Sequence, residues 1–167
     1  MKVKTQAGQP HRAPQQRARP RRCYPAGPLV GVGAIILNRG KVLLVQRARA
    51  PLKGLWSLPG GVLHAGERLR DGVCREVREE TGLEVQPLGV FEVFERIQKD
   101  ARGRTQYHYV LIDYLCRPKG GALRAADDAG AVQWVAREDL ERYPITPGTL
   151  EVIRRAMRKG RRRLLAG

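Results

Sequence analysis

The alternation of apolar and polar residues predicts a series of strands in the middle of the chain. Two apolar runs, at residues 30–37 and 41–47, are joined by Asn38-Arg39-Gly40, a composition typical of a tight hairpin turn. Residues 56–58 predict a short strand in front of Pro59 and two glycines. Further runs rich in branched and aromatic residues predict four more strands, at residues 84–90, 91–98, 107–117 and 131–136.

Two segments have the 3.6-residue period of an α-helix. The first covers residues 67–80 and ends at Gly82, where the left-handed backbone after a helix favours glycine. The second begins at Pro147 and runs to about residue 159. Their apolar stripes consist of Leu69, Val73 and Val77 in the first helix and of Leu150, Ile153 and Met157 in the second. Because the chain lacks a Rossmann glycine fingerprint and regular βαβ repeats, the pattern predicts an α/β domain with a mixed sheet between helices.

The formal net charge of +16 is concentrated at the two ends of the 167-residue chain. Residues 1–22 contain seven Lys and Arg and no acid, and residues 151–167 contain seven Lys and Arg against Glu151. The segment between them carries only the remaining +3. The excess charge therefore lies in the ends and not in the body of the protein.

These shifts in composition predict three parts. The N-terminal part has almost no large apolar residue and is predicted to be a disordered basic tail. We expect this tail to be merely solvated, with non-specific attraction to RNA, DNA or polyphosphate as the alternative. A transit peptide is a third reading, but the segment lacks serine. The predicted boundaries are 1–25 for this tail, 26–159 for one domain, and 160–167 for a basic C-terminal tail.

Composition also narrows the location of the protein. No apolar run approaches the ~20 residues that a membrane-spanning helix needs. The first apolar stretch begins too late for a secretory signal. The three cysteines are far apart and have no His or Cys companions, so neither a disulfide framework nor a zinc site is indicated. We therefore expect a cytoplasmic protein without membrane attachment.

Three glutamates near the end of the first helix suggest chemistry. Glu76, Glu79 and Glu80 lie at positions i, i+3 and i+4, so their carboxylates are neighbours and repel one another by ~0.2–0.5 kcal/mol per pair. The helix dipole disfavours anions at this end as well. A bound divalent cation would reverse both effects, whereas the simpler alternative is a solvated charged face. Arg75 lies four residues before Glu79 and can fix its side chain, and Gly72 would leave room for a metal or phosphate.

The wider segment identifies a family. It matches the pattern Gly-x5-Glu-x7-Arg-Glu-U-x-Glu-Glu-x-Gly-U, in which U is aliphatic, at every fixed position from Gly61 to Leu83. This pattern is the Nudix box, and the chain resembles the Nudix hydrolases over about residues 29–157. His64 stands where the family often has Glu. The resemblance implies the Nudix-type α/β/α sandwich with a mixed sheet between helices.

The resemblance also implies metal-dependent hydrolysis of a nucleoside diphosphate linked to another group. The implied ligands of Mg²⁺, or of Mn²⁺, are Glu76, Glu79, Glu80 and a carbonyl oxygen of Gly61 or Gly60. Glu67 is expected in a supporting role. Catalysis is expected from Glu76, Glu79 and Arg75, with a base that is either Glu79 or a loop acid. Asp128 is preferred over Asp127 as that acid, and Glu92 and Glu95 are rivals.

Segments outside the box resemble the bacterial ADP-ribose pyrophosphatase-like branch, which cuts ADP-ribose to AMP and ribose 5-phosphate. The proline that marks another ADP-ribose group is absent, because Lys99 stands in its place. Arg47 and Arg49 are candidates to bind phosphate oxygens, and Tyr107 is a candidate to stack on adenine. The alternatives are a nucleoside triphosphate pyrophosphatase, including one acting on oxidised nucleotides, and an RNA-directed protein that uses its basic tails. The fold often dimerises, and residues 91–98 are a candidate homodimer interface.

Overall fold

The computed structural model describes residues 21–48, 52–125 and 129–165, with side chains described as far as residue 159. Its strands are β1 (Leu29–Asn38), β2 (Lys41–Arg47), β3 (Trp56–Ser57), β4 (Gly60–Val62), β5 (Leu83–Lys99), β6 (Thr105–Gly121) and β7 (Ala129–Ala136). Its helices are α1 (Leu69–Thr81), the 3₁₀ helix η1 (Arg137–Arg142) and α2 (Thr149–Leu165). The element order agrees with the predicted alternation, except that the alternation did not predict β4 or η1 and β5 was predicted as two strands.

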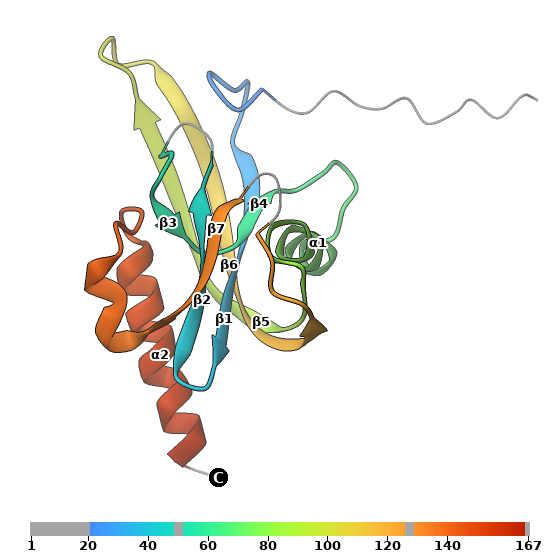
Figure 1. The fold of residues 1–167 in the computed structure, drawn as a ribbon. Coiled ribbons are helices and arrows are strands. Elements are labelled where there is room, and N and C mark those ends of the chain that lie inside the picture. Colours follow the sequence, from blue (N-terminus) through green and yellow to red (C-terminus); the bar gives the residue numbers. More distant parts are fainter. Residues whose placement is uncertain (1–20, 49–51, 126–128, 166–167) are drawn as a thin grey trace, which may run out of the picture.

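The strands form a mixed sheet that divides along β1 (Figure 1). β1 pairs in parallel with β6, whereas its other neighbours, β2 and β4, are antiparallel to it. β2 pairs with the end of β1, at Leu37, and β4 pairs with its beginning, at Gly31–Gly33. β5 lies outside β6 at the edge of this part of the sheet, and β7 continues the sheet beyond β2. The short strand β4 therefore reaches the centre of the fold, close to the start of β1.

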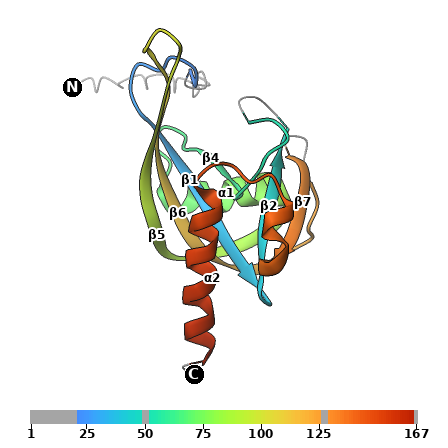
Figure 2. The ribbon, with the colours of Figure 1, turned by 90° about the vertical axis from the view of Figure 1, so that its left-hand side faces the viewer.

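The two helices lie on opposite faces of the sheet (Figures 1 and 2). The stripe of α1, formed by Val73 and Val77, is buried against one face of β1 and β6. On the other face, Ile35 of β1 packs against Val152 and Ala156 of α2. The predicted α/β/α arrangement with a mixed sheet between helices is confirmed.

Several predicted boundaries differ from the structure. The two strands predicted at 84–90 and 91–98 are one strand, β5, because it pairs with β6 along its whole length, with register shifts between Pro87 and Gly89 and between Val90 and Glu92. α1 begins at Leu69 rather than at residue 67, because the Glu67 side chain belongs to the loop before the helix. α2 begins at Thr149, two residues after Pro147, and continues to Leu165.

The turns that the sequence marked are present. Arg39 and Gly40 both have positive φ, at 46° and 76°, as a two-residue hairpin turn between twisted strands requires. Gly82 has φ 70° and its N–H donates to the Arg78 carbonyl, which ends α1 at the predicted glycine. These local features confirm that turn chemistry positions both β2 and α1.

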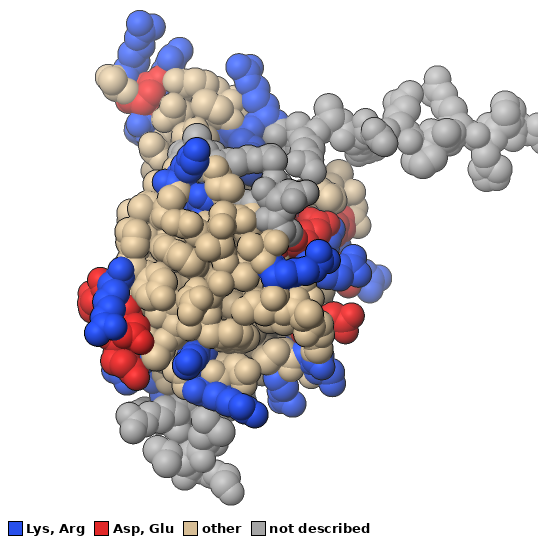
Figure 3. Space-filling view, viewed as in Figure 1, with Lys and Arg blue, Asp and Glu red and all other residues tan. Residues whose placement is uncertain are grey.

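The segment before β1 is attached to the tip of the β5–β6 hairpin. Tyr24, inside the range predicted as a tail, donates its backbone N–H to the Gln106 carbonyl at 2.8 Å and its hydroxyl to Asp100 at 2.9 Å. Arg104 also donates to Asp100 and lies over the Tyr24 ring. Lys and Arg gather at this tip in Figure 3. The predicted domain boundaries stay a prediction.

Within the described residues, no helix is long and apolar enough to cross a membrane.

Candidate active site

Arg75 of α1 binds three glutamates of the box, one from the preceding loop and two from the helix. Its Nε and Nη2 donate to the two carboxylate oxygens of Glu67 at 2.7 and 2.9 Å, which is a bidentate pair. Its Nη1 donates to Glu76 at 2.8 Å and to Glu79 at 3.1 Å. The Arg75 side chain is only 16% exposed. The predicted pairing of Arg75 with Glu79 is therefore present, within a larger network that also binds Glu67 and Glu76.

The network shifts the pKa values of Glu67 and Arg75. The hydrogen bonds from Arg75 are the main cause that lowers the pKa of Glu67 to about 2, and the His64 backbone N–H adds to this effect. In return, the hydrogen bond to Glu67 raises the pKa of Arg75 above its ordinary value. Both groups therefore stay charged at neutral pH, and Glu67 anchors the guanidinium from the loop before α1. This geometry agrees with the supporting role expected for Glu67.

The shifted pKa of Glu67 predicts loss of stability in acid. Because its pKa in the folded state lies below its ordinary value near 4.5, Glu67 stabilises the fold above that value. This stabilisation is lost as the pH falls toward 2. Chemical denaturation at a series of pH values should measure this loss as a fall in the free energy of unfolding between pH 5 and pH 2. The fall should be about 1–2 kcal/mol larger in the wild type than in Glu67→Gln. Glu84→Gln, an exposed control on β5, should follow the wild-type curve, and identical curves for all three proteins would contradict the prediction.

β4 brings two glycines against the glutamates. The Gly60 N–H donates to Oε2 of Glu80 at 2.9 Å, and a Cβ on Gly61 would lie 2.5 Å from the Glu76 carboxylate. Gly60 has φ 154°, and a Cβ there would also lie 2.9 Å from the Gly33 Cα. Side chains are thus excluded at both positions, and the β4 backbone lies directly against the carboxylates. This contact places Gly60 and Gly61 beside Glu76 and Glu80.

The donor set suits a hard divalent cation. Carboxylate and backbone oxygens are the ligands that Mg²⁺ and Ca²⁺ take in proteins, and the space at Gly61 that a Cβ would fill adjoins Glu76. Among the described residues, no group of three Asp, Glu, His or Cys side chains is arranged closely enough to hold a metal ion. Arg75 lies among them instead, and Glu79 is 55% exposed at the edge of the network. Metal ligation by Glu76, Glu79, Glu80 and Gly61 therefore stays a prediction.

Gly72 has a different role from the predicted one. A Cβ there would collide with Cδ2 of Leu63 and lie 3.2 Å from the Glu67 carboxylate. Gly72 is buried, so the missing side chain lets the loop before α1 pack onto the helix. It leaves no room for a metal or a phosphate, and that expectation is wrong.

The remaining predicted residues lie on other elements. Arg47 ends β2, and its Nε is buried without a hydrogen-bond partner among the described residues. Tyr107 and Tyr109 of β6 have nearly parallel rings, with centroids 6.5 Å apart. No hydrogen bond within the described residues joins Arg47 or Tyr107 to the glutamates. Arg49 and Asp128 lie outside the described residues.

Two rival acids and one unexpected acid lie on the sheet. Glu92 of β5 forms an ion pair with Arg155 of α2, and Glu95 is exposed. Asp113, in the middle of β6, is only 6% exposed. Sequence reasoning missed Asp113, although a single acid within the apolar run at 107–117 was a visible signal.

Comparison with known proteins agrees with the box. The Nudix domain family matches residues 27–156. An ADP-ribose pyrophosphatase of Methanocaldococcus jannaschii is 36% identical over 117 residues, which cover 70% of this chain and 65% of that protein. An 8-oxo-dGDP phosphatase of Mus musculus is 36% identical over 97 residues, which cover 58% of this chain and 27% of that protein. A MutT Nudix hydrolase structure from Burkholderia pseudomallei has a TM-score of 0.68 at 35% identity and covers 77% of this chain and 97% of its own.

The chain spans less than two thirds of the length of both curated relatives. The family match, in contrast, extends over most of the chain, and the solved structure aligns over nearly its whole length. The glutamates, the two glycines of β4 and the mixed sheet between α1 and α2 all lie inside the matched region. This chain therefore belongs to the Nudix family.

Proposed function

We propose that this chain is a metal-dependent hydrolase of a diphosphate linkage, and that it cuts ADP-ribose to AMP and ribose 5-phosphate. The observation that carries the proposal is the contact of the β4 glycines with Glu76 and Glu80 beside the Arg75 network. This arrangement offers several carboxylates and little steric bulk, which suits a cation with an anionic ligand. The similarity to the ADP-ribose pyrophosphatase of M. jannaschii supports the substrate.

The mechanism assigns each box residue a task. Glu76, Glu79, Glu80 and the Gly61 carbonyl would hold Mg²⁺, or Mn²⁺, which when bound neutralises the diphosphate and acidifies a water molecule. Arg75 positions Glu76 and Glu79 through its Nη1, and the Gly60 N–H orients Glu80. Water then attacks one phosphorus, the bond from that phosphorus to the bridging oxygen breaks, and the second phosphate leaves.

The proton of the attacking water needs an acceptor. Glu79 is our choice, because its carboxylate is half exposed and receives only the 3.1 Å hydrogen bond from Arg75 within the described residues. Glu92 is a weaker candidate, because Arg155 binds its carboxylate. Asp128 stays the predicted alternative from the loop before β7.

Substrate contacts are proposed outside the box. Arg47 has an unpartnered buried Nε that suits a phosphate oxygen, and Arg49 follows it in the chain. The parallel rings of Tyr107 and Tyr109 suit an adenine base. Arg47 ends β2 and Tyr107 lies on β6, whereas Arg49 lies outside the described residues.

A comparison of substrates tests the proposal. Initial rates with Mg²⁺ should give ADP-ribose a kcat/KM at least about tenfold above those of ATP and 8-oxo-dGTP, because each polar group of the site left unpaired costs ~1–3 kcal/mol. AMP should be one product by chromatography. The similarity to an 8-oxo-dGDP phosphatase favours oxidised nucleotides as the second candidate. A preference for 8-oxo-dGDP or for triphosphates would overturn ADP-ribose and leave the metal site intact.

The tails are proposed to act outside hydrolysis. Deleting residues 1–22 should leave kcat/KM for ADP-ribose within about threefold of the wild-type value, because the cut spares Tyr24 and all the buried residues of the described core. It should weaken salt-sensitive binding to single-stranded RNA, measured by fluorescence anisotropy at two salt concentrations. A full-length variant with the seven tail cations replaced by Gln is the matched control and should behave like the deletion. A large loss of turnover in either variant would place the tail at the active site.

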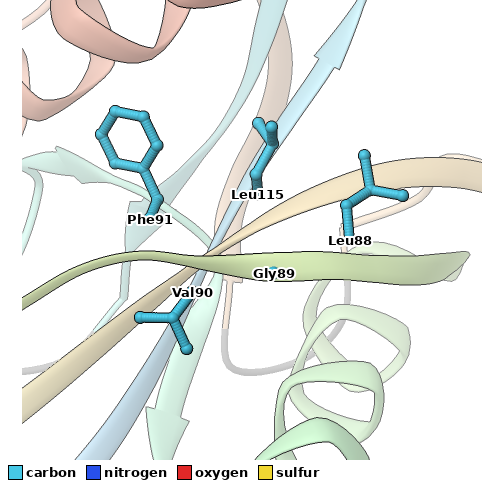
Figure 4. A pocket seen from close by; sticks show the side chains of 5 residues that line it. All are labelled: Leu88, Gly89, Val90, Phe91 and Leu115. Atoms are coloured by element: carbon cyan, nitrogen blue, oxygen red, sulfur yellow. The ribbon is translucent and has the colours of Figure 1, made fainter.

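A homodimer through residues 91–98 also stays a prediction. β5 is an edge strand, and Val90, Val93 and Ile97 are more than half exposed along it. A shallow pocket at the same edge is lined by Leu88–Phe91 and by Leu115 of β6 (Figure 4). In such a dimer, a second copy of the chain would cover these apolar side chains. Sedimentation velocity should show a dimer for the wild type and a monomer for Val93→Lys.

A further inference from the structure

Asp113 occupies an unusual position in the sheet. It lies in the middle of β6, paired with Gly33 of β1 on one side and with Glu92 of β5 on the other. Only 6% of the residue is exposed, and within the described residues it forms no hydrogen bond or ion pair, although its carboxylate oxygens are not fully sealed from solvent. A buried carboxyl without a partner is costly, by roughly 1–3 kcal/mol or more, so packing alone does not account for it.

The neighbours of Asp113 do not neutralise it. Its neighbour Glu92 on β5 is also an acid, and the Glu92 carboxylate forms an ion pair with Arg155 of α2. Burial, reinforced by the charge of Glu92, raises the pKa of Asp113 to about 6. No donor within the described residues offsets this rise.

The carboxyl points to the face of the sheet opposite α1. Side chains alternate along a strand, and Tyr114 packs under α1 whereas Leu115 packs with Ile35 and α2. Asp113 therefore shares its face with Leu115 and with the parallel rings of Tyr107 and Tyr109. At ~3.3 Å per residue, Tyr109 lies about 13 Å from Asp113 along this row, so the row offers a carboxylate acceptor and, farther out, aromatic surface.

Two glycines of β1 connect this row to the catalytic glutamates. Cβ atoms on Gly31 and Gly33 would crowd Leu111 and the Asp113 carboxyl, the latter with 3.2 Å to its Cγ, so both side chains lean across β1. Gly33 pairs on its other side with Gly60, whose N–H holds Glu80. At ~4.8 Å between neighbouring strands, the Asp113 backbone lies about 10 Å from Gly60. That is the length of a nucleoside beyond a diphosphate held at Glu80.

We propose that Asp113 determines specificity by accepting a hydrogen bond from a donor on the nucleoside part of the substrate. The donor is either a ribose hydroxyl or the amino group of the base, since a carboxylate accepts from both. This inference rests on the proposed function, because it takes the diphosphate to lie at the α1 glutamates. Asp113 takes no part in the bond cleavage itself.

The test compares Asp113→Asn and Asp113→Leu with the wild type in the full-length protein. Both variants should fold with a melting temperature at or above that of the wild type, because they remove a buried charge. Asp113→Leu should raise KM for ADP-ribose at least about tenfold, with kcat changed less than about threefold, and Asp113→Asn should have an intermediate KM because its amide keeps one acceptor. Glu84→Gln, an exposed acid on the neighbouring strand β5 that has no assigned role, should leave KM unchanged.

Two substrate analogues distinguish the donors. Wild-type protein should discriminate against 2′-deoxy-ADP-ribose if Asp113 reads a ribose hydroxyl, and against the inosine analogue if it reads the amino group. In Asp113→Leu that discrimination should disappear. An unchanged KM together with unchanged discrimination against both analogues would overturn the inference. If the wild type cuts a triphosphate instead of ADP-ribose, the proposed function fails, and the same variants assayed on that nucleotide and its 2′-deoxy and deaminated analogues still decide the role of Asp113.

Discussion

Replacing Glu79 or Glu80 with glutamine should lower kcat by more than roughly 100-fold while the protein stays folded. Glutamine keeps the shape of the side chain but removes a negative charge from the proposed cation site. Glu80 can still accept from the Gly60 N–H through its amide oxygen, and Glu79 loses only an exposed pair with Arg75. Removing one carboxylate also relieves its repulsion with the neighbouring glutamates of α1, which stabilises the fold by ~0.2–0.5 kcal/mol per pair. The melting temperature should therefore stay the same or rise slightly.

The measurement is steady-state hydrolysis in saturating Mg²⁺, with thermal unfolding followed by circular dichroism. Asp71→Asn is the matched control, because Asp71 is an exposed acid on the same helix with no contact to the network. It should leave kcat within about twofold. Near-wild-type turnover in Glu79→Gln or Glu80→Gln would mean that the assigned metal ligands are wrong.

Replacing Arg75 with leucine should cause the largest loss of stability among the box substitutions. The change leaves Glu67 and Glu76, whose side chains are each only 13% exposed, without their shared cation. Removing one partner of a buried ion pair costs about 3–5 kcal/mol, which for a chain of this size lowers the melting temperature by roughly 8–15 °C. Urea denaturation at pH 7 measures this difference directly.

A second arginine pair provides the comparison for Arg75. Arg104 binds Asp100 at the β5–β6 tip, but its side chain is 59% exposed, so Arg104→Leu should cost less than about 1 kcal/mol. The double variant Arg75→Leu, Glu67→Gln should recover part of the stability that Arg75→Leu loses, because one buried charge is removed with the other. A loss below about 1 kcal/mol in Arg75→Leu would show that the network does not support the fold.

Local patterns predicted much of the fold. The apolar stripe of α1, its end at Gly82 and the Arg39-Gly40 turn all depend on residues close together in the chain. β5, in contrast, was predicted as two strands, at 84–90 and 91–98. The ladder with β6 continues through register shifts between Pro87 and Gly89 and between Val90 and Glu92, and this pairing depends on a strand that follows later in the chain.

The candidate site also combines features that follow from local spacing with features that depend on tertiary packing. The pairing of Arg75 with Glu79 follows from their i,i+4 spacing, whereas the stronger bond to Glu67 depends on how the loop before α1 folds. Gly72 was misinterpreted for the same reason, since Leu63 contacts it from that loop. Asp113 was not singled out from the sequence because its neighbour Gly33 on β1 lies 80 residues earlier in the chain. Only the parallel pairing of β1 with β6 brings the two residues together.

The most direct test of a metal-dependent diphosphate hydrolase is a Mg²⁺ titration of chelator-treated, full-length protein with ADP-ribose. Cleavage should be absent in chelator and should return in a saturable manner as Mg²⁺ is added, with AMP and ribose 5-phosphate formed in equal amounts. Glu80→Gln should need far more Mg²⁺ or fail to recover. Equal formation of AMP with and without the metal would contradict the proposal that the α1 carboxylates act by holding a cation.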